Sequence, residues 1–402
     1  MAKILRCAAS LLIIATPWLA EAATLFGVVT ERAAPTAIEA AHRHLASHPE
    51  DRIELRTPAQ LMTASDQQLG KWLGEADSVL VVSVFGDAAR RIKDALSRHT
   101  RPQTPVLAMN GEASLNLMSR DNEGSLAAFP AETLRQLALE NPPESALTAA
   151  SKQPTARHWL AARQIWQAGG SDNTQALFAH LLAPQQPLPA IKPEPTLRLR
   201  VGQRELSDAA AWGKASQLGL KAEPTVVVLD LANMDGGPPA ALCRQIEANG
   251  QACVQVLTRW GGASREVLER LPELIAPAHA AALVVLQDFV VGAAEGREAV
   301  GEAFKKLDVP IFKAIRLNER TATQWRLSPD GLPADSVQYR VALPELPGIG
   351  QPIVVSALGA ARPDKLTGIE SRPPVVLGAE VDRLAARVGR WLALRGKANR
   401  DK

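Results

Sequence analysis

Two continuous runs of β-branched and aliphatic residues most constrain how this chain folds. Residues 78–84 read SVLVVSV and residues 225–231 read TVVVLDL, with little alternation between apolar and polar positions. A strand covered on one face alternates, whereas a strand buried on both faces is apolar throughout. Segments with helical spacing precede and follow both runs. The sequence therefore predicts parallel sheets with helices on both faces.

The order of the predicted elements divides the chain into a leader, two α/β lobes and a middle segment. Strands and helices alternate over residues 23–120 and again over residues 201–402, which close with a helix. Residues 121–200 combine helical patterns with a proline-rich connector. We expect an α/β fold with two Rossmann-like (flavodoxin-like) lobes, each built on a parallel sheet. We also expect a late strand over residues 337–343.

The first 22 residues have the features of a cleavable secretory signal. Lys3 and Arg6 precede an apolar run, and Ala20-Glu-Ala22 matches the small-x-small pattern of a cleavage site. The run is shorter than the roughly 20 residues that span a bilayer. The sequence therefore predicts removal of residues 1–22 and a periplasmic or secreted protein. An uncleaved membrane anchor is the alternative.

Charge and cysteine content exclude one class of partner and allow one covalent link. The formal net charge of +3 over 402 residues is too small to indicate a nucleic-acid partner. No later apolar stretch is long enough to predict a stable membrane span. Cys243 and Cys253 follow the leader, and an oxidising compartment favours a disulfide between them. Two buried thiols are the alternative, because sequence does not give their separation.

The candidate ligand-binding residues follow the ends of the predicted strands. In an open α/β sheet, ligands bind beyond the carboxyl ends of the strands, where glycines let backbone N–H groups approach an anion. Trp260 would add a flat apolar face that suits a macrocycle. Ordinary turn and capping roles are the alternative for each residue. The candidates are Glu31, Arg32, Asn110, Asn233, Asp235, Gly236, Trp260, Gly261, Gly262, Asp288 and Asn318.

His44 and His48 are the candidate metal ligands. They lie four residues apart in a predicted helix, so they share a face and could hold cobalt or zinc. A solvated helix end is the alternative. His158 and His180 are isolated in the sequence and are expected to be structural or exposed. Because the chain has no nucleophile elbow, P-loop, zinc motif or dinucleotide fingerprint, we nominate no catalytic residue.

Several short segments together resemble one enzyme family. After a glycine-glycine segment at residues 169–173, they comprise LDVPIFKAI (307–315), Trp325, VALPEL (341–346), PIVVS (352–356), RWLALR (390–395) and Asn399. In this order they are similar to the N-terminal part of cobaltochelatase large subunits, which are relatives of the magnesium-chelatase large subunit. Pro347 departs from the family, which has an aspartate there.

The resemblance implies a tetrapyrrole or corrinoid, or cobalt itself, as the ligand. Family members are much longer, and the body that inserts the metal has no counterpart in these 402 residues. Family chelation also depends on ATP through partner subunits, and an exported compartment lacks ATP. We therefore expect a relative that binds its ligand without inserting metal alone. There are two alternatives. The chain could be a generic two-lobed solute-binding protein that serves an uptake system, or half of a cobaltochelatase whose body is encoded separately.

Overall fold

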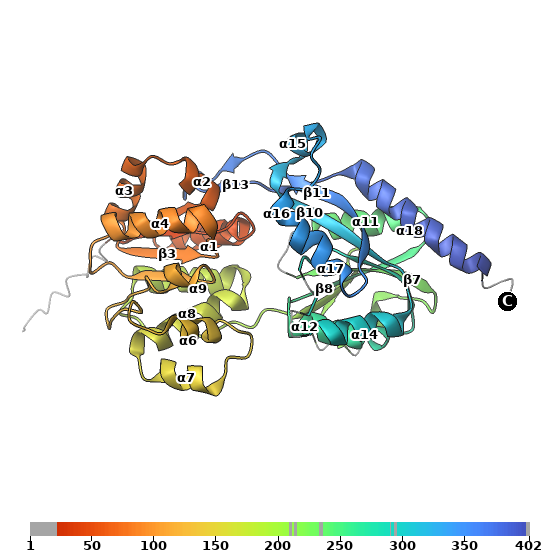
Figure 1. The fold of residues 1–402 in the computed structure, drawn as a ribbon, viewed down its shortest axis with the longest axis horizontal. Coiled ribbons are helices and arrows are strands. Elements are labelled where there is room, and N and C mark those ends of the chain that lie inside the picture. The colour runs from red at the N-terminus through yellow and green to blue at the C-terminus, as the bar shows by residue number, and fades with distance from the viewer. Residues whose placement is uncertain are drawn as a thin grey trace, which may run out of the picture.

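Two lobes lie side by side along the long axis of the molecule (Figure 1). The computed structural model describes residues 22–208, 211–212, 215–232, 236–289, 291–292 and 296–398. The chain passes from the first lobe to the second in the proline-rich connector, and it later reaches back to the first lobe and returns in the region of β13 (Glu370–Ser371). None of the helices within the described ranges combines the length and the apolar character that a membrane crossing requires.

The first lobe is built on a four-stranded sheet whose strands are all parallel. Its order is β2-β1-β3-β4, which is also the order of the first four strands in flavodoxin-like sheets. All of β3 is buried, as its apolar run predicted. The strands are β1 (Thr24–Val28), β2 (Arg52–Arg56), β3 (Ser78–Val82) and β4 (Val106–Met109).

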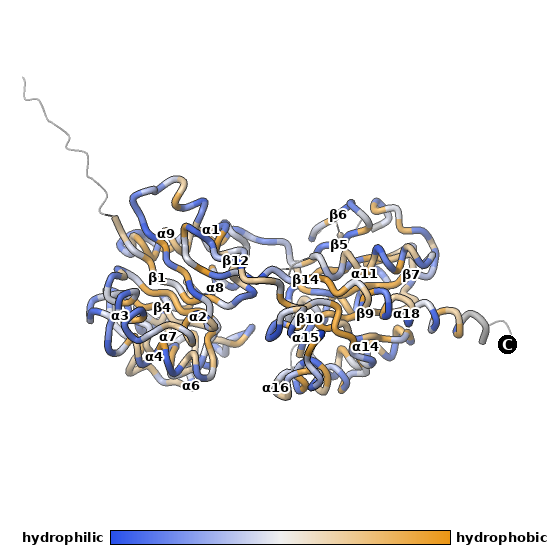
Figure 2. Tube along the Cα trace, turned by 90° about the horizontal axis from the view of Figure 1, so that it is seen from above, coloured by the Kyte–Doolittle hydropathy of each residue, from blue (hydrophilic) through white to orange (hydrophobic). Residues whose placement is uncertain are grey.

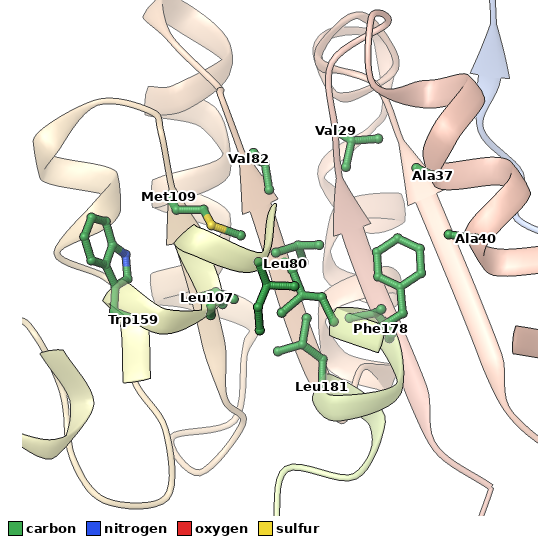
Figure 3. Close-up of a cluster of buried hydrophobic side chains, with 14 of the residues drawn as sticks. Val29, Ala37, Ala40, Leu80, Val82, Leu107, Met109, Trp159, Phe178 and Leu181 are labelled. Atoms are coloured by element: carbon green, nitrogen blue, oxygen red, sulfur yellow. The ribbon is translucent and has the colours of Figure 1, made fainter. Parts of the chain in front are cut away.

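Helices cover both faces of this sheet, and the middle segment supplies several of them. One face packs against α2, α3 and α4, and the other against α1, α6, α7, α8 and α9. Trp159 and Phe178 of the middle segment lie against the sheet near Leu80 and Leu107 (Figure 3). The Trp159 indole N–H also donates to the carbonyl of Ala108 at 2.8 Å. The helices are α1 (Ala34–Ser47), α2 (Pro58–Thr63), α3 (Asp66–Glu75), α4 (Gly86–His99), α5 (Ala113–Asn116), α6 (Ala131–Leu137), α7 (Glu144–Ser151), α8 (Pro154–Ala168) and α9 (Gly170–Leu182).

The second lobe has an eight-stranded mixed sheet, and the prediction of a purely parallel sheet is wrong here. Its order is β14-β11-β10-β9-β7-β8-β5-β6. The central strands β11, β10, β9, β7 and β8 are parallel, but β14, β5 and β6 add antiparallel pairs at the two edges. Only two residues join β5 to β6, and so short a turn allows only antiparallel pairing. The strands are β5 (Leu197–Val201), β6 (Arg204–Ser207), β7 (Pro224–Leu231), β8 (Ala252–Thr258), β9 (His279–Val285), β10 (Ile311–Thr321), β11 (Gly350–Leu358) and β14 (Pro374–Val376).

Helices also cover both faces of the second sheet. The helices α12 (Gly262–Glu269), α13 (Leu271–Leu274) and α14 (Arg297–Leu307) pack on one face, and α11 (Gly237–Ala248) and α18 (Gly378–Ala398) on the other. Hydrophobic segments run along the sheets of both lobes (Figure 2). Helix α18 buries Val381, Leu384 and Val388, whereas Trp391 stays 41% exposed.

The segment expected to form a strand over residues 337–343 is helical instead. It runs through α16 (Ala334–Val337), a π-helical turn (Gln338–Ala342) and α17 (Leu343–Glu345), after α15 (Ala322–Leu327). Strands β10 and β11 are parallel neighbours, so the chain between them must cross back over the sheet. A further strand in this position would not return the chain to the start of β11.

Cys243 and Cys253 form a disulfide between α11 and β8. Their Cα atoms are 5.3 Å apart, within the usual range for bridged cysteines. Of the two alternatives left open by the sequence, the bridge is the one found in the structure.

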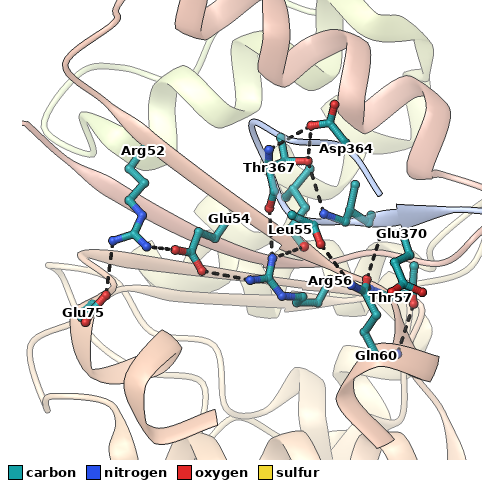
Figure 4. Close-up of polar contacts among 12 residues, drawn as sticks. Arg52, Glu54, Leu55, Arg56, Thr57, Gln60, Glu75, Asp364, Thr367 and Glu370 are labelled. Atoms are coloured by element: carbon teal, nitrogen blue, oxygen red, sulfur yellow. Dashed lines mark hydrogen bonds and ion pairs between the residues drawn. The ribbon is translucent and has the colours of Figure 1, made fainter. Parts of the chain in front are cut away.

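A long excursion from the second lobe covers the outer edge of the first sheet. We call residues 359–373 the arm; it contains a small hairpin of β12 (Arg362–Pro363) and β13. The amide of Leu55, in edge strand β2, donates to the carbonyl of Thr367 at 2.9 Å (Figure 4). Because β2 has β1 on its other side, the arm takes the place of a further strand.

Side-chain contacts fasten the arm to the first lobe. The carboxamide of Gln60 donates to the carbonyl of Gly368 and accepts from the amide of Glu370, both at 3.0 Å. Ile369 is fully buried in the core of the first lobe. The arm therefore holds the two lobes in a fixed relationship beside the cleft described next.

Candidate functional site

A buried cluster of charged side chains lies toward the carboxyl ends of β7, β9 and β10. Asp230 in β7 and Arg316 in β10 are only 1% and 4% exposed. Arg316 donates through Nη1 to Oδ1 of Asp230 at 2.6 Å and through Nη2 to Oδ2. Strand β9 lies between β7 and β10, so the pair reaches across it. This two-pronged geometry offsets part of the cost of removing both charges from water.

Lys313 forms the second buried element of the cluster. Its ammonium group donates to the carbonyls of Leu286 and Gln287, at 3.2 and 2.7 Å, and to Oδ1 of Asp288 at 3.0 Å. All three of its N–H groups are thus used. Burial lowers the pKa of Lys313, and the nearby charge of Asp288 acts in the opposite direction. Lys313 therefore fixes the chain at the end of β9 and orients Asp288.

Arg340 extends the cluster toward the surface. It binds both carboxylate oxygens of Glu319, at 2.8 and 2.7 Å, and the hydroxyl of Tyr339 donates to the same carboxylate at 2.6 Å. Burial and the bond to Glu319 raise the pKa of Tyr339. The ring of Tyr339 stacks on Phe289, which is 50% exposed and has a φ of 59°. A π-helical turn and a bulky residue at positive φ are both features that gather at functional sites.

Arg32 brings the first lobe to this cluster. It lies in the turn between β1 and α1, and its side chain is exposed. Desolvation lowers the pKa of Arg32, and the charges of the second lobe act in both directions, since Asp288 raises this pKa and Arg316 lowers it. We call the region between the lobes around Arg32 and Asp288 the cleft. Arg32 and Asp288, both nominated from the sequence, therefore face each other across the lobes.

Trp260, Gly261 and Gly262 lie at a separate contact between the lobes. Trp260 is 49% exposed at the end of β8. The amide of Gly262, at the start of α12, donates to both carboxylate oxygens of Glu140 from the first lobe, each at 3.2 Å. Gly261 has a φ of 90°, and a Cβ there would lie 2.7 Å from Glu140. The expected anion at this helix start is thus a carboxylate of the chain itself.

The other nominated residues are scattered around the strand ends. Glu31 is half-buried next to Arg32, and Gly236 directly precedes α11. Asn318 is exposed within β10, three residues before the strand ends, and not beyond the strand as expected. Oδ1 of Asn110 accepts from Arg163 at 2.8 Å beside a hollow of about 480 Å³. Asn233 and Asp235 lie outside the described residues.

The two candidate metal ligands, His44 and His48, stack on each other. Their ring centroids are 4.5 Å apart, and Nε2 of His44 lies 2.8 Å from Oδ2 of Asp51. Within the described ranges, no group of three or more His, Cys, Asp and Glu side chains is arranged to hold a metal. A metal at this pair stays a prediction.

Comparison with known proteins establishes the family. The model of the family described as CobN/Magnesium Chelatase matches residues 163–402, more than half of the chain. The chain belongs to the CobN/magnesium chelatase family. The charged cluster lies within the matched region, whereas Arg32 and the strand that binds the arm precede it.

Individual relatives of this family member are distant and much longer. It is 26% identical over 285 residues to the magnesium-chelatase subunit ChlH of rice chloroplasts, in both the indica and japonica subspecies, covering 62% of this chain and 19% of ChlH. It is 30% identical over 127 residues to the uncharacterized protein MJ1441 of Methanocaldococcus jannaschii, covering 30% and 10% of the two chains. The catalytic subunit of cobaltochelatase from Mycobacterium tuberculosis aligns with 94% of this chain and 28% of its own, at 20% identity and a TM-score of 0.48. The chain thus spans about a fifth or less of the curated relatives it matches.

The rule that ligands bind beyond the ends of strands did not identify the residues at the centre of the charged cluster in this family member. Asp230, Lys313 and Arg316 lie within strands, and Arg340 lies in the segment that was expected to be a strand. A signal for the first three was present, because a charge inside an apolar parallel strand must find a buried partner. The sequence gives no comparable signal for Arg340.

Proposed function

We propose that this chain binds a carboxylate-bearing tetrapyrrole or corrinoid in the cleft between its lobes and holds it without inserting a metal alone. One observation carries the proposal: Arg32 of the first lobe is an exposed residue whose charge interacts with Asp288 and Asp230 of the charged cluster in the second lobe. Arginine binds carboxylates through two parallel hydrogen bonds. Membership of the CobN/magnesium chelatase family favours a macrocycle as the bearer of those carboxylates.

The charge of the cleft supports an anionic ligand. Among the described residues, the cluster of the second lobe is balanced, with Lys313, Arg316 and Arg340 against Asp230, Asp288 and Glu319, and the first lobe adds Arg32 beside Glu31. The three cations of the second lobe are each paired with a carboxylate. Arg32 has no ion pair or hydrogen bond within the described parts of the chain. Of these four cations, Arg32 is therefore the one left to pair with an anionic ligand.

Exposed aromatic faces support a flat ligand. The ring of Phe289 is half-exposed next to Asp288 and is backed by Tyr339. Trp260 offers a second exposed ring at the end of β8. Aromatic side chains contribute large apolar contacts in an offset or edge-on arrangement, which suits the plane of a macrocycle. We propose cobalt, free or within the macrocycle, as the metal.

Export and metal insertion belong to the same proposal. We propose that residues 1–22 are removed and that the mature protein works in the periplasm or is secreted. Insertion of the metal would then need a catalytic body in addition to these 402 residues, and an uptake system is the other proposed partner. Intact-mass measurement of the exported protein should give a chain that starts at Ala23; retention of Met1 would contradict cleavage and favour an uncleaved anchor.

The binding proposal is tested by absorbance titration with a porphyrin that bears carboxylates, with cobalamin and with Co²⁺. Arg32→Gln should weaken binding of the porphyrin roughly ten- to a hundredfold, the scale of hydrogen bonds to charged groups. Arg90→Gln is the matched control, because Arg90 is an exposed arginine of the first lobe that pairs only with Asp87 among the described residues. The methyl ester of the same porphyrin should lose its dependence on Arg32.

Three outcomes would contradict the proposal. Equal affinities of wild type and Arg32→Gln would move the site away from Arg32. An absence of binding to any macrocycle would favour a generic solute-binding protein. Metallation of a macrocycle by the purified chain alone would overturn the assignment of a purely holding role.

Trp260→Ala tests the second aromatic face, where loss of a stacked ring should cost about 1–3 kcal/mol of binding free energy.

A further inference from the structure

A separate cavity opens at the end of the first sheet opposite the cleft. It has a volume of about 650 Å³ and includes Val106, the first residue of β4. Helices α8 and α9 form one wall, and residues 184–188 of the proline-rich connector form another. His158 of α8 and His180 of α9 both line it. Two histidines that are isolated in the sequence thus meet inside a cavity.

The two imidazole rings face each other through the same type of nitrogen. Nε2 of His158 lies 2.8 Å from Nε2 of His180. The rings are close to perpendicular, with an interplanar angle of 68°. His180 is 6% exposed, and its Nδ1 is buried without a hydrogen-bond partner in the described chain. Two nitrogens at this distance need one proton between them, because two lone pairs or two N–H groups would repel.

Asp121 fixes the orientation of His158. Its Oδ2 lies 2.9 Å from Nδ1 of His158. Its Oδ1 accepts from the hydroxyl of Thr155 at 2.9 Å and from the amides of Glu123 and Gly124 at 2.9 and 3.0 Å. A carboxylate held this firmly accepts a hydrogen bond from Nδ1–H of the histidine and leaves the Nε2 lone pair facing His180. A carboxylate that orients a histidine through its far nitrogen is the usual outer partner of a metal-bound histidine.

We propose that His158 and His180 bind a divalent first-row transition metal of the zinc or cobalt type through their Nε2 atoms. The ion takes the place of the proton between the two nitrogens, and that proton moves to Nδ1 of His180, so both imidazoles bind the metal as neutral ligands. Metal–nitrogen bonds of about 2.0–2.1 Å in tetrahedral geometry place the nitrogens about 3.3 Å apart, so the rings must separate by roughly half an ångström. Water from the cavity fills the open positions. With two protein ligands, the site is exchangeable rather than structural.

This site is independent of the cleft, and each proposal stands if the other fails. The test uses the full chain without a histidine tag, freed of metal with a chelator and titrated with Zn²⁺ in a calorimeter. Co²⁺ in place of Zn²⁺ gives visible absorption that reports nitrogen coordination in tetrahedral geometry. We expect one saturable Zn²⁺ site per chain that His158→Gln and His180→Gln each weaken by more than tenfold. Asp121→Asn should weaken it about 10- to 100-fold, the range for losing an outer partner.

His279→Gln is the matched control, because His279 is an exposed histidine at the start of β9 and belongs to neither close histidine pair. We expect it to leave Zn²⁺ affinity unchanged. Loss of binding in His48→Gln with retention in His158→Gln would place the metal on α1 and overturn the proposal. No saturable binding by the wild-type chain would also overturn it. Thermal melting of each variant identifies a folding defect, and His158→Gln is the decisive variant because that side chain is 25% exposed.

Discussion

Asp230 and Arg316 form an ion pair across an intervening strand with almost no access to water. Asp230→Asn would leave the guanidinium of Arg316 buried without its counter-charge. Breaking a buried pair in this way costs about 3–5 kcal/mol of unfolding free energy. Urea unfolding of the variant measures this cost. Asp87→Asn, which removes a carboxylate from a pair that is about 70% exposed, should change stability little; equal effects of the two variants would contradict the prediction.

Docking of the arm depends on Ile369. Ile369→Ala should weaken docking by about 2–5 kcal/mol, the usual cost of truncating a buried aliphatic side chain. Because the amide of Leu55 donates to the arm, its hydrogen exchange reports undocking directly. Leu366→Ala is the matched control, since Leu366 lies in the same turn but is 60% exposed. Exchange at Leu55 that does not accelerate in Ile369→Ala would show that the arm is held by its polar contacts.

Attachment of the arm should also weaken in acid. Burial acts to raise the pKa of Asp364, but hydrogen bonds from Thr367 and His42 outweigh it and hold the pKa below 3.8. The unfolded state then takes up this proton first as the pH falls. The stabilisation is present above pH 3.8 and is lost as the pH drops below it. The difference in unfolding free energy between wild type and Asp364→Asn should therefore shrink on acidification; a constant difference would refute this.

Reduction of the disulfide should destabilise the second lobe modestly. Cys243 and Cys253 are ten residues apart, and closing so short a loop contributes roughly 2–3 kcal/mol. Thiol labelling of the unfolded protein should find two more reactive cysteines after reduction than before. Identical labelling before and after reduction would show that the bridge does not form in solution.

Sequence predicted the interior of the sheets better than their edges. The run at residues 78–84 identified a strand buried on both faces, because only such a strand is apolar throughout. The β5–β6 hairpin is short and partly polar, so it carries no apolar run that would have marked it. The helical segment at 337–343 has β-branched and aromatic residues, and only the need to cross the sheet makes it helical.

The sequence also predicted part of the candidate site. Arg32 and Asp288 were found because each follows a strand, and the carboxyl ends of both sheets face the cleft. Lys313 and Arg316 were not found, because the rule for ligand sites in open α/β sheets considers only residues beyond the ends of the strands. The contact of Glu140 with Gly262 joins positions 122 residues apart and depends on how the lobes dock. The meeting of His158 and His180 depends likewise on how α8 packs on α9.

The arm determines which segments of this chain can fold independently. Strand β2 is closed by residues that come more than 300 positions later in the sequence. A polypeptide that ended before residue 359 would expose the β2 edge, which is a template for pairing with a neighbouring copy. The first lobe is therefore not an autonomous module, although its sheet is complete. Gene fusions or recombination events that move this lobe must carry residues 359–373 with it, or the product will be prone to aggregate.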